Sequence, residues 1–288
     1  MKPASFEYHR ASTTLEAVAL IDDLGEDAKF IAGGQSLVPM MNFRLARPTA
    51  LIDIMHIPKL NSINRDGDSL IVGALTRHRT LELTTDASVV DGFALLSSAA
   101  RWIGHTPIRT RGTVGGSLVH ADSSAEWCMM ARLFDAQLTL EGPRGRRTVS
   151  SGDWFQGMFS TAADFNELLV EIRFTSPRRY GALAEFARRH GDFALAAVAV
   201  AFDVVDDRLT NVGIVIGGVE GIPVRASEAE TLMEGASLGA VDVEGSARSA
   251  AACVEPMESE PVEAAYRRHL VDTLTRRAIL EALAAGVQ

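Results

Sequence analysis

The feature that most constrains the fold is a glycine pair, Gly33-Gly34, which directly follows a short apolar segment expected to form a strand at residues 29–32. A helix is predicted before this strand, beginning at a capping box on Thr13 and ending at Gly25. A further strand is expected at residues 50–54. Strand, helix and strand in this order favour a β–α–β unit, which can place a phosphate where a strand runs into a loop.

The glycine pair lies within the segment Ala32-Gly33-Gly34-Gln35-Ser36. Two adjacent glycines let the backbone bend so that successive N–H groups point at one anion, and Ser36 adds a hydroxyl donor. The segment has neither the spacing of the Rossmann fingerprint nor the Gly-Lys-Ser/Thr of a P-loop. A tight turn without a ligand is the alternative interpretation of these residues.

A second glycine-rich stretch, Arg109 to Ser117, is followed by Asp122 and contains hydroxyl donors and two arginines. We expect residues 104–124 to form a long connection, and loops of that length inside a compact domain are usually functional. Taken alone, this stretch is equally consistent with a structural turn. Together with the first loop it favours a large phosphorylated ligand, such as a dinucleotide in extended form, which needs one surface for its diphosphate and another for its ring.

The rest of the chain has the pattern of an α+β protein. Strands are predicted at 69–73, 137–141, 147–149 and 167–174, and helices at 80–83 and 90–102. After Pro177 the pattern becomes a three-stranded antiparallel meander at 183–189, 194–205 and 209–217, with a hairpin turn at Asp206-Asp207 and helices at 227–233, 245–254 and 262–285. We therefore expect one domain over residues 1–176, with lobes at 1–55 and 56–176, and a second over 177–288.

Charge and composition exclude several classes of function. The chain has 28 Lys and Arg against 37 Asp and Glu, a net charge of −9, and no basic cluster, which argues against nucleic acid and anionic membranes as partners. The apolar run at 193–202 is too short to span a bilayer and the N-terminus has no signal core, so we expect a cytoplasmic protein without a membrane segment. Two cysteines cannot supply the four thiolates of an iron–sulfur cluster, and no metal site is expected.

Several other polar residues are expected to have structural roles. The histidines beside the second loop lack a nucleophile and an orienting acid, so no catalytic residue is assigned. Asp122 and Glu126 could form an acid–base pair, although a ligand hydroxyl or amide suits Asp122 better. The arginine pairs at 267–268 and 276–277 are expected on a solvated or subunit-facing side of the last helix.

The two loops, together with Arg188-Arg189-His190-Gly191-Asp192-Phe193, make the sequence resemble a known family. It is similar to the FAD-binding medium subunits of molybdenum hydroxylases, the carbon monoxide dehydrogenase and xanthine dehydrogenase family, over almost its whole length. Gln35 and Ser117 are closer to the N-heterocycle dehydrogenases, of the quinoline, nicotine or caffeine type, than to the carbon monoxide enzymes. Relatives often have lysine where this chain has Glu185, so a lysine contact to FAD is not expected there.

The resemblance implies the FAD-binding fold of the vanillyl-alcohol oxidase and xanthine dehydrogenase type, with a β–α–β lobe, a mixed-sheet lobe, and a C-terminal domain of antiparallel sheet and helices. It implies that the first loop wraps the FAD diphosphate and that the second, with Asp122, holds the rest of the cofactor. Leu168 matches a position near the adenine, and Phe193, next to Asp192, matches an aromatic position beside the flavin ring. The implied cofactor-binding residues are Ala32, Gly33, Gly34, Gln35, Ser36, Leu37, Thr113, Gly115, Gly116, Ser117, Asp122, Leu168, Asp192 and Phe193.

The implied function is electron relay. A large subunit would hydroxylate the substrate at a molybdenum–pterin site, and two [2Fe–2S] clusters on a small subunit would pass the electrons to FAD on this chain and so to an external acceptor. The implied assembly is a dimer of heterotrimers. One alternative is a self-contained FAD-dependent reductase or oxidase of the same fold, although the residues after Pro177 include few candidate catalytic side chains. Another is a flavin-free interaction subunit, against which the intact glycine loops argue.

Overall fold

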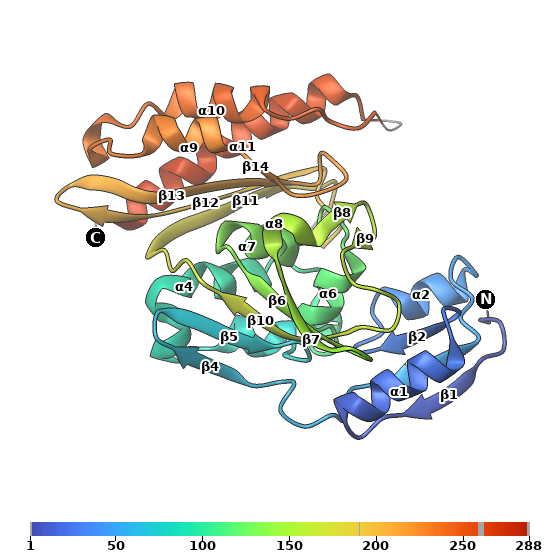
Figure 1. Ribbon diagram of the computed structural model, residues 1–288. Coiled ribbons are helices and arrows are strands. Elements are labelled where there is room, and N and C mark those ends of the chain that lie inside the picture. The colour runs from blue at the N-terminus through green and yellow to red at the C-terminus, as the bar shows by residue number, and fades with distance from the viewer. Residues whose placement is uncertain (1, 190, 259–261, 287–288) are drawn as a thin grey trace.

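The computed structural model describes residues 2–189, 191–258 and 262–286. Three main sheets follow one another along the chain, and Figure 1 shows them as a small N-terminal lobe, a central sheet with helices, and a C-terminal sheet covered by helices. The predicted α+β architecture is confirmed. Within the described ranges, no helix combines the length and the apolar character needed to cross a membrane.

The N-terminal lobe is the predicted β–α–β unit, and local sequence explains its boundaries. Thr13 caps the first helix by accepting a hydrogen bond from the backbone N–H of Glu16 at 3.1 Å. The Glu16 carboxylate in turn accepts a hydrogen bond from the backbone N–H of Ser12, not from that of Thr13. Gly25 ends the helix with a φ of +81°, which glycine adopts without strain. The strands are parallel in the order β1–β3–β2, and the elements are β1 (Glu7–Arg10), α1 (Thr14–Leu24), β2 (Ala28–Ile31), α2 (Leu37–Asn42) and β3 (Ala50–Asp53).

The central sheet has five strands in the order β4–β5–β10–β6–β7. We expected a mixed sheet, but every pairing is antiparallel, because β4–β5 and β6–β7 are hairpins and β10 returns between them. The strands are β4 (Ile63–Asp66), β5 (Ser69–Gly73), β6 (Gln137–Gly142), β7 (Gly145–Ser150) and β10 (Leu168–Phe174), with a small β8 (Phe155–Gly157) and β9 (Ser160–Thr161) pair beside them. The accompanying helices are α3 (His78–Leu83), α4 (Ala87–Ala100), α5 (Thr106–Arg109), α6 (Val114–His120), α7 (Glu126–Leu133) and α8 (Ser151–Trp154).

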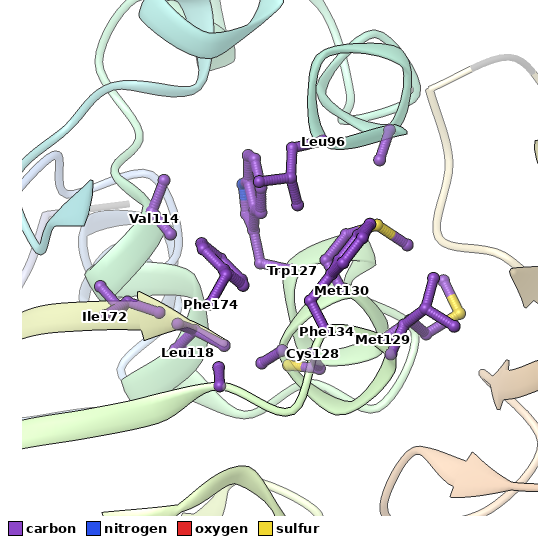
Figure 2. Close-up of a cluster of buried hydrophobic side chains, with 14 of the residues drawn as sticks. Leu96, Val114, Leu118, Trp127, Cys128, Met129, Met130, Phe134, Ile172 and Phe174 are labelled. Atoms are coloured by element: carbon purple, nitrogen blue, oxygen red, sulfur yellow. The ribbon is translucent and has the colours of Figure 1, made fainter. Parts of the chain in front are cut away.

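Helix α7 is the centre of the largest hydrophobic core. Its side chains from Trp127 to Ala131 are all buried, as expected for a helix that packs on several sides, here against α4, α6 and the C-terminal sheet. Phe134 follows the helix and lies 6.2 Å from Phe174 of β10, between ring centroids, in an edge-to-face arrangement. Figure 2 shows these side chains meeting Leu96 of α4 and the other side chains of the cluster. The core thus joins the central sheet to the C-terminal domain.

The C-terminal domain begins with the predicted meander. Asp206 and Asp207 form the hairpin turn with φ of +49° and +62°, the left-handed pair required by a two-residue turn. A short fourth strand, absent from the sequence prediction, extends the sheet. The elements are β11 (Tyr180–Phe186), β12 (Ala196–Val205), β13 (Arg208–Gly217), β14 (Val224–Arg225), α9 (Ser227–Met233), the 3₁₀ turn η1 (Leu238–Ala240), α10 (Val243–Ala252) and α11 (Ala264–Gly286).

Both faces of the C-terminal sheet are buried. On β12, Ala197, Ala199 and Ala201 belong to the central core, whereas Val198 and Val200 pack against the helices of their own domain. This explains the continuous apolar run in the sequence, because a strand covered on both sides has no need of polar alternation. Figure 1 shows α9, α10 and α11 on one side of the sheet and α7 on the other.

The prediction for Arg267 is wrong. This residue was expected on a solvated or subunit-facing side of the last helix, but it is 8% exposed. Its guanidinium donates hydrogen bonds to the carbonyl oxygens of Leu195 at 2.6 Å and Gly218 at 2.8 Å. Helical periodicity cannot reveal this role, because arginine normally marks the solvent side of a helix and the two carbonyls lie in distant parts of the sequence.

Candidate functional site

The first glycine loop connects β2 to α2 and has unused backbone donors. In the described part of the chain, the N–H groups of Gly33, Gly34, Gln35 and Ser36 donate to no carbonyl or side chain. Gly34 has a φ of +71°, and the Gln35 side chain donates to the Gly33 carbonyl at 2.9 Å. Consecutive unpaired amides around a left-handed residue form a concave donor site for an anion. The predicted chemistry of this loop therefore has a structural basis.

We predicted that the second glycine-rich stretch lies in one long connection, but the structure shows helices there. It contains α5 and α6, and Thr113 is the N-cap of α6, accepting a hydrogen bond from the Gly116 N–H at 3.1 Å. The N–H groups of Val114 and Gly115 donate to the carbonyls of Thr76 and Ala74 at 2.9 and 2.8 Å. These amides are therefore occupied within the protein. Two glycines are unfavourable inside a helix, which explains why the sequence pattern predicted a loop.

Tertiary packing brings the two glycine segments into contact. A Cβ atom on Gly33 would lie 2.1 Å from the carbonyl oxygen of Arg111, and one on Gly115 would lie 2.5 Å from the Cβ of Ala74. Neither glycine has a positive φ, so each is required by close approach rather than by backbone conformation. The first loop can thus rest directly on the backbone that precedes α6.

An open cleft of about 1120 Å³ lies along this contact. Its walls include Ala32, Gly33, Gly34 and Gln35 of the predicted site, while the remaining predicted residues do not line it. A cleft of this size is at the upper end of the range for small-ligand pockets.

Sequence reasoning missed the charged residues of the cleft. Arg77 and Arg111 are exposed there, and within the described ranges neither forms an ion pair with a carboxylate. Tyr8 and Asp53 also line the cleft, and the Tyr8 hydroxyl donates a hydrogen bond of 2.5 Å to the carboxylate of Asp53. That bond raises the pKa of Tyr8. Arg111 is one of the two arginines noted within the second stretch, although it was not assigned to the site, whereas no local signal indicates Arg77, Tyr8 or Asp53.

The neighbouring Arg109 has a different role, although the sequence grouped it with Arg111. It is buried, pairs with Glu82 at 2.8 Å, and donates to the carbonyls of Ile103 and Gly104, both at 3.0 Å. These bonds fix the connection between α4 and α5. Arg109 is therefore structural, and Arg111 is the arginine of this motif that faces the cleft.

The other predicted residues are distributed around the central and C-terminal domains. One Asp122 oxygen accepts bonds from the N–H and hydroxyl of Ser124, at 2.9 and 2.7 Å, and so closes the turn before α7. Leu168 is buried at the start of β10. Asp192 and Phe193 are exposed on the connection between β11 and β12, with Phe193 74% accessible. His190 of the same motif lies outside the described residues.

His78 packs against the second glycine segment at Gly112. Its Nδ1 accepts a hydrogen bond of 2.9 Å from the indole N–H of Trp127, and its ring occupies the space that a Cβ on Gly112 would need. Burial, with the nearby Arg109 charge, lowers the pKa of His78 to about 4. The imidazole is therefore neutral at physiological pH, as its acceptor role requires.

We expect this histidine to make stability depend on acid pH. Because its folded-state pKa lies below the unfolded value of about 6.5, its contribution is present above pH ~6.5 and is lost as pH falls toward 4. The loss amounts to about 3 kcal/mol. Urea unfolding at several pH values should show a smaller acid loss in His78→Gln than in wild type. The same loss in both would refute the assignment, and His269→Gln, an exposed position on α11, is the control.

Comparison with known proteins identifies the family. Residues 4–177 match the FAD binding domain in molybdopterin dehydrogenase, and residues 181–282 match the CO dehydrogenase flavoprotein C-terminal domain. The chain belongs to the FAD-binding medium subunits of molybdenum hydroxylases. The resemblance drawn from the loops is thereby confirmed, as is its assignment as an oxidoreductase subunit with FAD as cofactor.

Relatives among the medium subunits align along almost their whole length. The chain is 36% identical to the 6-hydroxypseudooxynicotine dehydrogenase complex subunit alpha of Paenarthrobacter nicotinovorans, covering 98% of this chain and 96% of the relative. It is 34% identical to the nicotine 6-hydroxylase medium subunit of that organism, covering 98% and 99%. A solved carbon monoxide dehydrogenase from Hydrogenophaga pseudoflava has a chain with a TM-score of 0.93 and 35% identity, covering 99% of each chain.

The residues of the cleft fit the cofactor of these medium subunits. A diphosphate carries negative charge and several acceptor oxygens. Within the described ranges, the cleft is lined by three residues with free amides, Gly33, Gly34 and Gln35, and by two arginines without an ion pair. This donor set complements a dinucleotide diphosphate in both charge and hydrogen bonding.

Proposed function

We propose that this protein is the FAD-binding subunit of a molybdenum hydroxylase, and that its FAD accepts electrons from an iron–sulfur partner and passes them to an external acceptor. The observation that carries the proposal is the cleft that Gly33, Gly34 and Gln35, with their free amides, line together with Arg77 and Arg111. The alignment with the nicotine 6-hydroxylase medium subunit over nearly its full length supports the same assignment. Bound FAD would supply a group able to accept and release electrons, while the protein supplies its position and electrostatic environment.

Within this proposal the cleft residues have distinct tasks. The amides of Gly33, Gly34, Gln35 and Ser36 would bind the diphosphate, with Ala32 and Leu37 on either side, and the two arginines would neutralise its charge. Thr113, Gly115, Gly116 and Ser117 would hold the start of α6, behind the cleft, since the amides of the last three are engaged in the cap and first turn of that helix. By family position, Asp122, Asp192 and Phe193 would lie near the flavin ring and Leu168 near the adenine.

The partners follow from the same proposal. A small subunit would carry two [2Fe–2S] clusters and a large subunit the molybdenum–pterin, assembled as a dimer of heterotrimers in the cytoplasm. The FAD-binding domain would comprise residues 1–176, with lobes at 1–55 and 56–176, and the C-terminal domain residues 177–288. Relatives described as medium subunits or medium chains support a multi-subunit assembly.

The proposal is tested by purifying the chain, recording its absorption spectrum, and identifying any flavin released by heat. We expect bound FAD that is not reduced by NAD(P)H or by simple alcohols in the absence of partners. Rapid reduction by NAD(P)H and reoxidation by a substrate would instead indicate a self-contained flavoenzyme. A colourless protein that takes up no added FAD would contradict the proposal.

Arg77 and Arg111 should contribute directly to FAD affinity. Replacing either by alanine removes one charge-assisted contact, so we expect the dissociation constant of FAD to rise about tenfold for each. Quenching of flavin fluorescence on titration with the protein measures this. Arg79→Ala is the matched control, because Arg79 lies two residues after Arg77, does not line the cleft and pairs with Glu82 at 2.8 Å. Equal affinity in all three variants would exclude the arginines from the diphosphate site.

A further inference from the structure

Phe159 lies at the tip of the hairpin formed by β8 and β9, and its backbone conformation is unfavourable for its side chain. Its φ is +57°, in the left-handed region that glycine adopts without strain and that a bulky residue rarely adopts. The Phe159 side chain does not gain full burial in return, since the residue is 54% exposed. Strained conformations persist only where the surrounding structure imposes them. Neighbouring contacts must therefore hold this residue in place.

Two hydrogen bonds tie the hairpin to the last turn of α6. The Phe159 N–H donates to the carbonyl oxygen of Ala121 at 3.0 Å. Ala121 ends α6 and is itself left-handed, with a φ of +51°. Just before β8, the indole N–H of Trp154 donates to the carbonyl oxygen of Leu118 at 2.9 Å, and both residues are buried. The position of Phe159 is thus fixed relative to the C-terminal end of α6.

The Phe159 ring packs on a histidine. Its centroid lies 5.0 Å from that of the His120 imidazole, and the two ring planes are tilted by 38°. His120 is the last residue of α6 and is half-buried. Burial lowers the pKa of His120 in spite of the opposing charge of Asp122, so the imidazole is neutral at pH 7. The strained residue thus places an aromatic ring against a neutral imidazole at the end of this helix, a contact that restricts both rings.

His120 lies at one end of an exposed face of α6 that begins at the first glycine loop. Gly116, Val119 and His120 are three or four positions apart and share this face. Gly116 is exposed, and Val119 is 44% exposed. A Cβ on Gly116 would lie 4.0 Å from the Cβ of Ala32, which also lines the cleft. A ligand whose diphosphate binds the amides after Ala32 can therefore continue along this face as far as His120.

We propose that Phe159 is a positioning residue for the cofactor, which accepts a strained backbone in order to hold His120 beside the exposed face of α6. Without the ring, the His120 side chain is free to move over this face, and binding FAD must then order it. Stability alone would favour glycine at this position, because glycine has no strain there. The inference rests on the proposed function, which assigns the diphosphate to the first loop and Asp122, two residues after His120, to the flavin ring.

Phe159→Gly distinguishes this role from a purely structural one without any cofactor. Because the substitution relieves the strain, we expect the melting temperature of the flavin-free protein to be unchanged or higher. The ring current of Phe159 displaces the Hε1 proton resonance of His120 in the NMR spectrum, and this displacement should disappear. Phe159→Tyr, which keeps an aromatic ring, should retain it, and His120→Gln identifies the resonance.

Lys59→Gly is the matched control. Lys59 is also an exposed residue with a left-handed backbone, at a φ of +69°, but it does not line the cleft. Its replacement should likewise leave the melting temperature unchanged or higher, and the His120 resonance should stay at its wild-type position. A fall of more than about 4 °C in the melting temperature of Phe159→Gly would show that Phe159 serves packing, and would overturn the inference.

The second test measures the dissociation constant of FAD by quenching of flavin fluorescence. We expect it to rise about three- to tenfold in Phe159→Gly, the cost of ordering one side chain on binding, and to keep the wild-type value in Phe159→Tyr and Lys59→Gly. Wild-type affinity in Phe159→Gly would overturn the inference. Failure of the wild type to bind FAD would overturn the proposed function instead, and the melting temperatures and the His120 resonance would still decide whether Phe159 holds His120 at the expense of stability.

Discussion

Gly33→Ala should yield a folded protein that no longer retains FAD. The new Cβ would lie 2.1 Å from the Arg111 carbonyl oxygen, a distance that no side-chain rotation can relieve because both atoms belong to the backbone framework. The loop must therefore move away from the segment before α6, and its four amides lose their common direction. We expect the flavin content after purification to fall below about a tenth of wild type, a loss of more than about 1.4 kcal/mol in binding.

Gly239→Ala is the matched control for this substitution. A Cβ at Gly239 meets nothing within 4 Å, and its backbone does not have the positive φ that disfavours alanine. We expect wild-type flavin content there, measured as the ratio of flavin absorbance to protein. Gly33→Ala protein with full flavin and an unchanged melting temperature would show that the loop tolerates the displacement and would remove it from the diphosphate site.

Arg178→Met should destabilise the whole protein by about 3–5 kcal/mol. The Arg178 side chain is 2% exposed and lies where the linker after β10 meets both domains. It donates to the carbonyl of Asn211 at 2.7 Å and to those of Leu133 and Ser176, and its guanidinium lies 3.5 Å from Asp135. The substitution leaves these three carbonyls without the guanidinium donor, and a polar group that loses its partner in a buried network is costly.

The adjacent arginine provides the control. Arg179 has a side chain that is 68% exposed, and its only ion pair within the described residues is a 3.8 Å contact with Asp91. Replacing it by alanine should change the free energy of unfolding by less than about 0.5 kcal/mol. Urea unfolding of the two variants distinguishes them, and equal stabilities would show that the buried network is not what joins the domains.

Predictions from the sequence succeeded where the deciding interactions are local. The cap at Thr13, the end of α1 at Gly25 and the hairpin at Asp206-Asp207 depend on residues a few positions apart. The second glycine stretch was predicted less well, because Gly115 and Gly116 oppose a helix by intrinsic propensity. That helix is held by the Thr113 cap and by hydrogen bonds to residues 74 and 76, about forty positions earlier.

By itself, the sequence determined the β–α–β start, the meander, and a first loop rich in potential anion donors. The tertiary structure decided which donors remain free. It paired amides of the second segment with carbonyls of the residues that follow β5, buried Arg109 against Glu82, and left Arg111 in the cleft with Arg77. Each of these outcomes depends on contacts between residues far apart in the chain, which no local pattern of hydrophobicity, charge or turn chemistry encodes.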